Sequence, residues 1–309
     1  PKESKGPLGG YLDLRLQDDK NNQDTYERSE SLMQEQAIRG ALQKAGKKES
    51  EIGALISGDL INEIIASSFA ASKFEIPYLG VYNACSTFGE AIIIGSTMIS
   101  GGFLKSAVCV SSSHFSSIER QFRYPLELGT QPTPTSQWTV TGAGCALLSI
   151  GGEGPRVDLA TIGKIVDKGI DDANNMGGAM APAAVDTVIA HLKDTERSLS
   201  YYDYIFTGDL GRFGKSLFVD LMGREGYSVG TNYNDCGAII YGKEDKKSLQ
   251  GGSGAGCVAT VFNSYLISLL KERKGVKMLL VPTGALLSKV SSLQGETIPC
   301  IAHAVAIES

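Results

Sequence analysis

The second half of the chain repeats the order of the first half, and this internal repeat restricts the possible folds more than any other feature. Ala54–Leu60 (ALISGDL) is matched 150 residues later by Tyr204–Leu210 (YIFTGDL). Ala107–Ser113 (AVCVSSS) is matched 171 residues later by Met278–Gly284 (MLLVPTG). Two matches in the same order indicate one α/β unit present twice, with the 21 extra residues of the second copy falling around Tyr227–Gln250.

Apolar runs typical of strands alternate with segments of helical period. We expect strands at 52–57, 76–82, 106–111, 141–150 and 298–308, the second of them buried, and helices at 25–45, 61–74 and 85–101. In the extra residues, Gly237–Gly242 followed by a charged turn predicts a hairpin. This βαβα order favours parallel sheets covered by helices, with a first half at 1–155 and a second half at 156–309.

The composition excludes several classes of protein. With 42% hydrophobic and 20% charged residues, a chain of 309 residues is long enough to bury a large core. The 29 basic and 34 acidic residues give a net charge of −5, so a nucleic-acid partner is not expected. No stretch approaches the roughly 20 apolar residues of a membrane-spanning helix.

The six cysteines are widely spaced and indicate a reducing, intracellular compartment. They form no CxxC or CxxH pair, and the chain has only three histidines, so no metal site is predicted. Most of these cysteines are expected to be small buried residues.

Cys85 lies where a strand is expected to end and an amphipathic helix to begin. The positive end of the helix dipole favours a thiolate at such a position, and the free amide groups there would also bind an anionic group. Spacing alone equally allows Cys85 to be a small capping or core residue.

An ordered series of motifs runs through nearly the whole chain. They are SGDL at 57–60, ACST at 84–87, SSH at 112–114, ERQFRYP at 119–125, TVTG at 139–142, GAMAPA at 178–183, TGDL at 207–210, NDCG at 234–237, GGSG at 251–254, TGALLS at 283–288 and IPCIAH at 298–303. Together with the two α/β halves, they resemble the thiolase superfamily and, within it, most closely the stage V sporulation protein AD family of spore-forming bacteria.

This resemblance implies a fold, a ligand and partners. The implied fold is a thiolase-like α/β structure of five layers, α-β-α-β-α, with mixed sheets and with a first strand that precedes Pro1. The implied function is the binding of dipicolinic acid (pyridine-2,6-dicarboxylate) and its movement, with calcium, across the inner membrane of the developing spore. The implied partners are membrane-embedded proteins of the same sporulation operon and a second copy of the chain, with the protein associated peripherally with that membrane.

The sequence departs from the resembling enzymes at positions that carry catalysis. Where those enzymes place a His or Asn, this chain has Asp209 in one turn and no such residue in Gly251–Cys257. An ionised Asp209 cannot donate a hydrogen bond to an oxyanion, and His303 stands where a glycine is expected. We therefore predict a binding protein without catalytic residues. The alternatives are an acyl-thioester transferase that uses Cys85 with His303 as a displaced base, and a structural subunit without a ligand.

The predicted binding site is the remnant of the thiolase substrate pocket. Its expected lining is Cys85, His114, Asp209, Ser253, Cys300 and His303. Arg120 and Arg123 are the predicted partners of the ligand carboxylates, because a planar guanidinium can bind a carboxylate through two hydrogen bonds. Surface ion pairs with Glu119 or Glu127 are the alternative for the arginines, and a role in the core is the alternative for His114. His191 is expected to be solvated.

Overall fold

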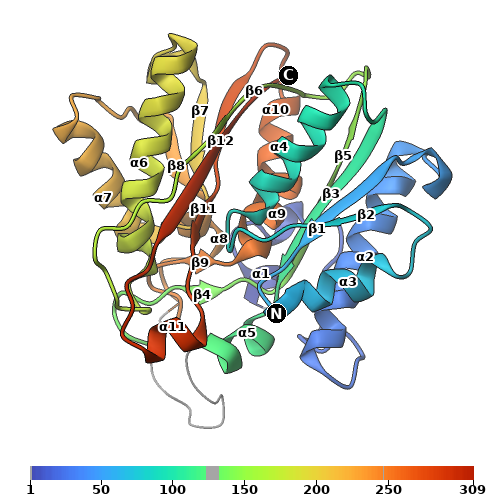
Figure 1. Cartoon of the computed structure of the whole chain (residues 1–309), viewed down its shortest axis with the longest axis horizontal. Helices are drawn as coiled ribbons and strands as arrows, with labels where there is room; N and C mark the ends of the chain where they lie inside the picture. The colour runs from blue at the N-terminus through green and yellow to red at the C-terminus, as the bar shows by residue number, and fades with distance from the viewer. Residues whose placement is uncertain (1, 123–131, 246) are drawn as a thin grey trace.

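The computed structural model describes residues 2–122, 132–245 and 247–309, and several of its elements recur in the same order (Figure 1). Each copy contains a 20-residue helix, α2 (Tyr26–Ala45) or α6 (Met176–Thr195), and the two helices begin 150 residues apart. The strand that follows, β1 (Ala54–Gly58) or β7 (Tyr204–Thr207), keeps the same offset. The repeat seen in the sequence is therefore a repeat of structure.

The later elements also correspond in order. In the first copy they are β2 (Tyr78–Gly80), α4 (Thr87–Ser100), β3 (Ser106–Ser113) and β5 (Gly142–Ser149), and in the second they are β8 (Tyr233–Asp235), α9 (Ala255–Val261), β10 (Lys277–Val281) and β12 (Cys300–Glu308). The remaining elements are α1 (Lys2–Lys5), η1 (Gly9–Tyr11), η2 (Glu49–Glu51), η3 (Asn62–Ile64), α3 (Ile65–Ala71), α5 (Phe115–Phe122), β4 (Trp138–Thr139), β6 (Arg156–Ile162), η5 (Leu199–Tyr201), α7 (Gly211–Arg224), α8 (Cys236–Ile240), β9 (Gly252–Ser253), η6 (Phe262–Leu266), α10 (Ile267–Lys271), β11 (Thr283–Ala285) and α11 (Lys289–Leu293).

Both large sheets are mixed. In the first sheet the order is β2-β1-β3-β5, with β1 parallel to both neighbours and β5 antiparallel to β3. In the second sheet β10, β7 and β8 are parallel, and β12 runs antiparallel to β10, β11 and β6. The expected parallel strands are thus present, but the strand that closes each half reverses direction.

The helices and sheets form five layers of the thiolase-like kind (Figure 1). Helices α4, α9 and α10 lie between the sheets, α2 and α3 cover the outer face of the first sheet, and α6 and α7 cover the second. The central layer carries the largest core cluster, in which Phe88 from α4 packs against Phe262 after α9 at a ring distance of 5.7 Å. The carboxyl ends of β1 and β3 and the start of α4 consequently meet the second half of the chain.

Two local predictions are wrong. The segment 76–82 contains only the three-residue strand β2, all of whose residues are exposed, because β2 pairs with β1 on one side and lies at the sheet edge. The predicted hairpin at Gly237–Gly242 is instead helix α8, which Asp235 caps by accepting a hydrogen bond from the Ala238 amide at 2.8 Å.

Two further findings bear on the class of protein. No helix in the described part of the chain combines the length and apolar character needed to cross a membrane. None of the six cysteines forms a disulfide bond.

Candidate functional site

Cys85 sits on a tight, strained turn between β2 and α4. Ala84 adopts the left-handed conformation, with φ of 51°, which is unfavourable for a residue with a side chain. The Ser86 amide donates to the Asn83 carbonyl at 3.0 Å, and the Thr87 hydroxyl donates to the Ala84 carbonyl at 2.6 Å. These bonds hold the turn closed and fix the position of the Cys85 side chain, which is 6% exposed.

The second half of the chain is in close contact with this turn. A Cβ atom on Gly284 of β11 would come within 2.4 Å of the Asn83 carbonyl oxygen, so only glycine allows this approach. The Ser86 hydroxyl also donates to the Pro282 carbonyl at 3.3 Å. The site is therefore assembled from both copies of the repeat.

A narrow apolar cavity lies against Cys85. Its volume is about 40 Å³. Its lining residues are Leu60, Tyr82, Ala84, Cys85, Ile118, Thr139, Ala173, Met176, Ser253, Gly254, Ala285 and Leu287. Because the only polar side chains here are hydroxyl and thiol groups, this cavity suits an uncharged, flat part of a ligand.

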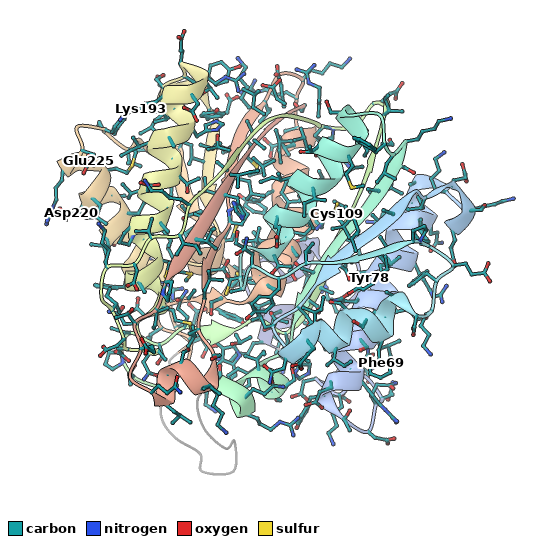
Figure 2. All side chains as sticks on the ribbon, in the orientation of Figure 1. Phe69, Tyr78, Cys109, Lys193, Asp220 and Glu225 are labelled. Carbon is teal, nitrogen blue, oxygen red and sulfur yellow. The ribbon has the colours of Figure 1, made fainter. Side chains whose placement is uncertain are left out.

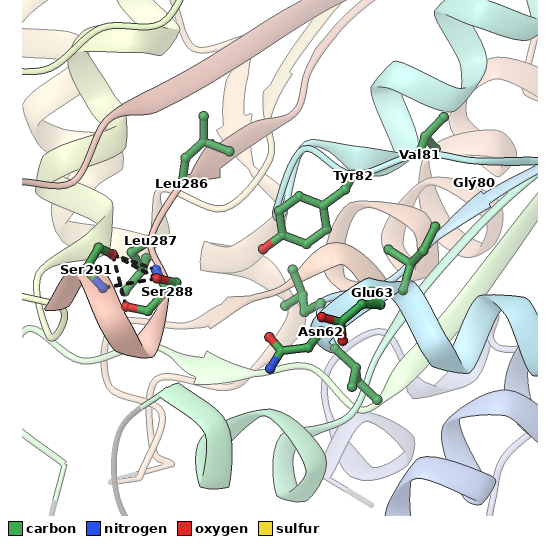
Figure 3. A pocket seen from close by; sticks show the side chains of 12 residues that line it. Asn62, Glu63, Gly80, Val81, Tyr82, Leu286, Leu287, Ser288 and Ser291 are labelled. Carbon is green, nitrogen blue, oxygen red and sulfur yellow. Dashed lines mark hydrogen bonds between the residues drawn. The ribbon is translucent and has the colours of Figure 1, made fainter. Parts of the chain in front are cut away.

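A larger groove of about 520 Å³ adjoins the cavity and shares Leu60, Tyr82 and Leu287 with it (Figure 3). One wall is the loop with Asn62 and Glu63, and the opposite wall is the segment from Leu286 to Ser291. The Tyr82 ring lies between these walls (Figure 3). Burial raises the pKa of the Tyr82 phenol to about 12, so its hydroxyl remains a hydrogen-bond donor at neutral pH.

Of the predicted site residues, the structure brings Cys85 and Ser253 to the cavity. His303 lies behind it, with Nε2 at 2.8 Å from the side-chain amide of Asn83 and Nδ1 accepting from the Gly163 amide at 3.2 Å. Because Nδ1 accepts, the neutral ring carries its proton on Nε2, beside the Asn83 side-chain amide. Burial lowers the pKa of His303 to about 4, so the ring is neutral and fixes the turn before Cys85.

The His114 ring also makes structural hydrogen bonds. Its Nε2 lies 2.6 Å from the Asp19 carbonyl, and its Nδ1 accepts from the Ser116 amide at 3.1 Å. Desolvation lowers the pKa of His114. This side chain therefore ties the loop before α2 to the end of β3.

The prediction that His191 is solvated is wrong. The side chain is fully buried under the second sheet, where its Nδ1 lies 2.8 Å from the Thr161 hydroxyl and its Nε2 lies 2.6 Å from the Tyr202 hydroxyl. Burial lowers its pKa to about 4. The helix segment looked polar in sequence, but α6 packs closely between β12 and α7.

Asp209 and Cys300 are buried outside the cavity lining. The Asp209 carboxyl faces Cys257 and the Gly254 backbone, behind the cavity wall, and burial together with nearby Asp235 raises its pKa well above the usual value. The Cys300 thiol lies 3.4 Å from the Ile298 carbonyl, and burial raises its pKa to about 12. The Cys300 thiol is therefore protonated at neutral pH.

Of the two predicted carboxylate partners, the described one, Arg120, does not line the cavity. Arg120 points to the surface, where it pairs with Glu27 and donates to the Ser116 carbonyl at 3.1 Å. An ion pair was the alternative expected for this arginine, although with Glu119 or Glu127 as its partner. Arg123 lies outside the described residues. Among the described residues, no group of three or more His, Cys, Asp or Glu side chains could hold a metal ion.

Sequence reasoning missed the groove. Its walls come from the segment after the SGDL motif and from the end of the TGALLS motif, both of which were noted without a role in the site. Motif matches located these segments, but only the fold shows that they face one another across Tyr82.

The sequence of the chain is similar to that of a known protein family. The sequence profile of the family described as stage V sporulation protein AD matches residues 1–308. Stage V sporulation protein AD of Bacillus subtilis strain 168 is 42% identical over 308 residues, which span 100% of this chain and 91% of that protein.

Solved structures similar to this chain are thiolase-like condensing enzymes. A cerulenin-bound OleA of Xanthomonas campestris has a TM-score of 0.66 at 17% identity and covers 93% of this chain and 83% of its own. The tetronic acid condensing enzyme AbyA1 has a TM-score of 0.63 at 15% identity, with 96% and 90% covered. The 3-oxoacyl-[acyl-carrier-protein] synthase III of Aquifex aeolicus VF5 has a TM-score of 0.57 at 11% identity, with 98% and 94% covered. At these identities the similarity shows the thiolase-like fold.

Proposed function

Because the chain belongs to the stage V sporulation protein AD family, we propose that it binds dipicolinate and acts without chemical turnover in the spore machinery that moves calcium dipicolinate across the inner membrane. In this proposal the protein is associated peripherally with that membrane and works with membrane-embedded proteins of the same operon.

The observation that carries the non-catalytic part of the proposal concerns the three histidines. Each of His114, His191 and His303 has both ring nitrogens within hydrogen-bond distance of groups other than the Cys85 thiol. A thiolase-type reaction needs a base that takes the thiol proton and later moves protons on the substrate. No imidazole of this chain is placed to do so.

The size of the two spaces supports the position of the ligand. Small-molecule sites usually enclose about 300–1,000 Å³. The groove of about 520 Å³ falls in this range, whereas the cavity of about 40 Å³ does not. We therefore place the pyridine ring at their junction, against Leu60, Tyr82 and Leu287, with the two carboxylates in the groove.

The charge of the groove favours one form of the ligand. Glu63 lines the groove, and its carboxylate would repel a free dicarboxylate anion. Calcium binds six to eight oxygen atoms and accepts carboxylates readily. A calcium dipicolinate chelate would bring its metal ion to the Glu63 carboxylate, so the proposed ligand is the chelate rather than the free anion.

Isothermal titration calorimetry with dipicolinate, with and without calcium, tests the proposal. Leu287→Trp fills the junction and should weaken binding by at least tenfold, whereas Leu293→Trp, on the solvent side of α11 and 78% exposed, should leave it unchanged. Glu63→Gln should weaken binding of the calcium chelate and strengthen binding of free dipicolinate. Absence of binding by the wild type at millimolar ligand, with or without calcium, would refute the proposed function.

A further inference from the structure

A buried network of polar side chains lies beneath the groove, apart from the groups assigned to the ligand. All of its members are fully buried, and they come from α2, α3, α5 and the ends of β1 and β3. They are Glu30, Gln34, Asp59, Ser67, Ser112 and Ser117. Two carboxyl groups in one buried network need an explanation, because burying a charge without a partner is costly.

The hydrogen bonds of the network run from donor to acceptor outward from Gln34. Its amide donates to the Ser67 hydroxyl and to the Ser112 hydroxyl, each at 2.8 Å. The Ser67 hydroxyl then donates to Asp59 at 2.6 Å, and the Ser112 hydroxyl donates to Glu30 at 2.9 Å. Gln34 therefore connects the two carboxyl groups through one serine each.

The hydrogen-bond partners distinguish the two carboxyl groups. Asp59 accepts from the Ile61 amide, the Ser67 amide and the Ser67 hydroxyl, three bonds that favour the ionised form. Among the described residues, Glu30 accepts only from the Ser112 and Ser117 hydroxyls, each at 2.9 Å, and from no backbone amide. Burial raises the pKa of both groups, which disfavours two charges in one network. We therefore assign the single negative charge to Asp59, the better-bonded group, and the proton to Glu30.

Within the described ranges, neither carboxyl group has a cation as an ion-pair partner. In the parts of the chain that the structure describes, no salt bridge reaches Glu30 or Asp59. The nearby titratable groups are Glu27, which pairs with Arg120, together with His114, Tyr82 and Cys85. Burial, reinforced by Asp59, raises the pKa of Glu30 to about 8.

Asp59 controls the loop that forms one wall of the groove. Its carboxylate holds the amide of Ile61 at 2.8 Å and the amide of Ser67, in the first turn of α3, at 2.7 Å, and so ties together the two sides of η3. Between them Glu63 and Ile64 have φ of 58° and 48°, a strained conformation that persists only while the loop is held. Glu30 is fixed within the helix α2, whereas the loop borders water, so repulsion between two charged carboxylates would move the loop.

We propose that the network is a proton-controlled latch, in which the proton on Glu30 keeps the loop 61–67 closed over the groove and loss of that proton at alkaline pH releases it. The proposal concerns the loop itself, and only its effect on ligand affinity rests on the proposed function.

Hydrogen–deuterium exchange of the 60–67 segment between pH 6 and 9.5, corrected for the intrinsic pH dependence of exchange, tests the latch. In the wild type, protection of this segment should fall at least tenfold across the range. Glu30→Gln keeps the shape of the side chain but has no proton to lose, so protection should stay high. Glu3→Gln makes the same change at a buried carboxyl that is bonded to Thr141 and Tyr241, and it should behave as the wild type.

Asp59→Asn provides a second test, because it removes the charge that holds the loop ends. Its 60–67 segment should exchange quickly at every pH. The proposal is wrong if the wild-type segment keeps its protection to pH 9.5, or if either Glu30→Gln or Asp59→Asn shows the wild-type pH dependence. Calorimetry with the calcium chelate at pH 6 and 9 adds the functional consequence. If the calcium chelate fails to bind at both pH values, the proposed function is contradicted. The exchange experiment alone then tests the latch.

Discussion

At the scale of single residues, the decisive question for Cys85 is whether its thiol accepts an acyl group. Because the proposed function involves no chemical turnover, incubation with acetoacetyl-CoA or another acyl-CoA should leave no acyl group on the protein. Intact-mass spectrometry measures this directly, with Cys85→Ala as the control for attachment elsewhere. An acyl adduct on the wild type that Cys85→Ala lacks would establish the transferase alternative.

The proton on Glu30 also predicts how stability depends on pH. The pKa of Glu30 is about 8 in the folded protein against 4.5 as its ordinary value, so the folded state binds the extra proton between these pH values. Stability should therefore fall as pH rises through this window, by about 1.4 kcal/mol per pH unit from this residue. Urea unfolding between pH 5.5 and 7.5 measures the slope. Glu30→Gln should make it shallower by about that amount, and equal slopes for the two proteins would contradict the assignment.

At this scale, the sequence predicted the backbone positions of the site residues better than it predicted where their side chains point. Cys85 and Ser253 reach the cavity because each lies at a turn that the repeat places against the other half. His303 and His114 lie on the expected strand and strand end, but their rings point to Asn83 and Asp19. Residue type and spacing fix the backbone position, whereas the neighbours packed around a ring decide its direction.

At the scale of elements, the contact between β11 and the Cys85 turn gives a testable consequence. Gly284→Ala would place a methyl group 2.4 Å from the Asn83 carbonyl oxygen, and neither backbone can move freely. We expect a loss of about 1–3 kcal/mol of stability, as for overpacked cores. Gly223→Ala in α7 has no atom within 4 Å of the new methyl group and should be neutral or stabilising by up to about 1 kcal/mol.

Urea unfolding of these two variants separates a steric effect from a general effect of losing glycine. A Gly284→Ala protein as stable as the wild type would show that β11 does not press on the turn. The comparison also indicates why the element scale was partly predictable. The strands and long helices follow from hydrophobic period and the repeat, whereas α8 forms because Asp235 caps it, a local interaction that the glycine pattern did not reveal.

At the scale of the whole molecule, the repeat predicted the two halves, but only the folded chain shows how they share the site. The cavity draws Cys85 and Ile118 from the first half and Ser253 and Leu287 from the second. No spacing rule links residues that are 168 positions apart, such as Cys85 and Ser253. Their approach depends on the central layer, where α4 and α9 pack side by side between the sheets (Figure 1). Side chains occupy the space between the two sheets (Figure 2).

We propose that two copies of the chain associate through strand β2, at the edge of the first sheet. Strand β2 pairs on one side with β1, and its Tyr78 and Leu79 are 36% and 40% exposed, beside Phe69 at 61%. An unpaired strand edge with exposed apolar side chains is a template for another strand, and two copies of β2 can pair antiparallel about a twofold axis.

Sedimentation equilibrium should therefore give twice the chain mass of 32.8 kDa. Tyr78→Lys should give the monomer, because a charge on an edge strand opposes pairing, whereas Phe103→Lys, 81% exposed on the loop after α4, should remain dimeric. A monomeric wild type, or a dimer that persists in Tyr78→Lys with an unchanged circular dichroism spectrum, would exclude this edge as the interface.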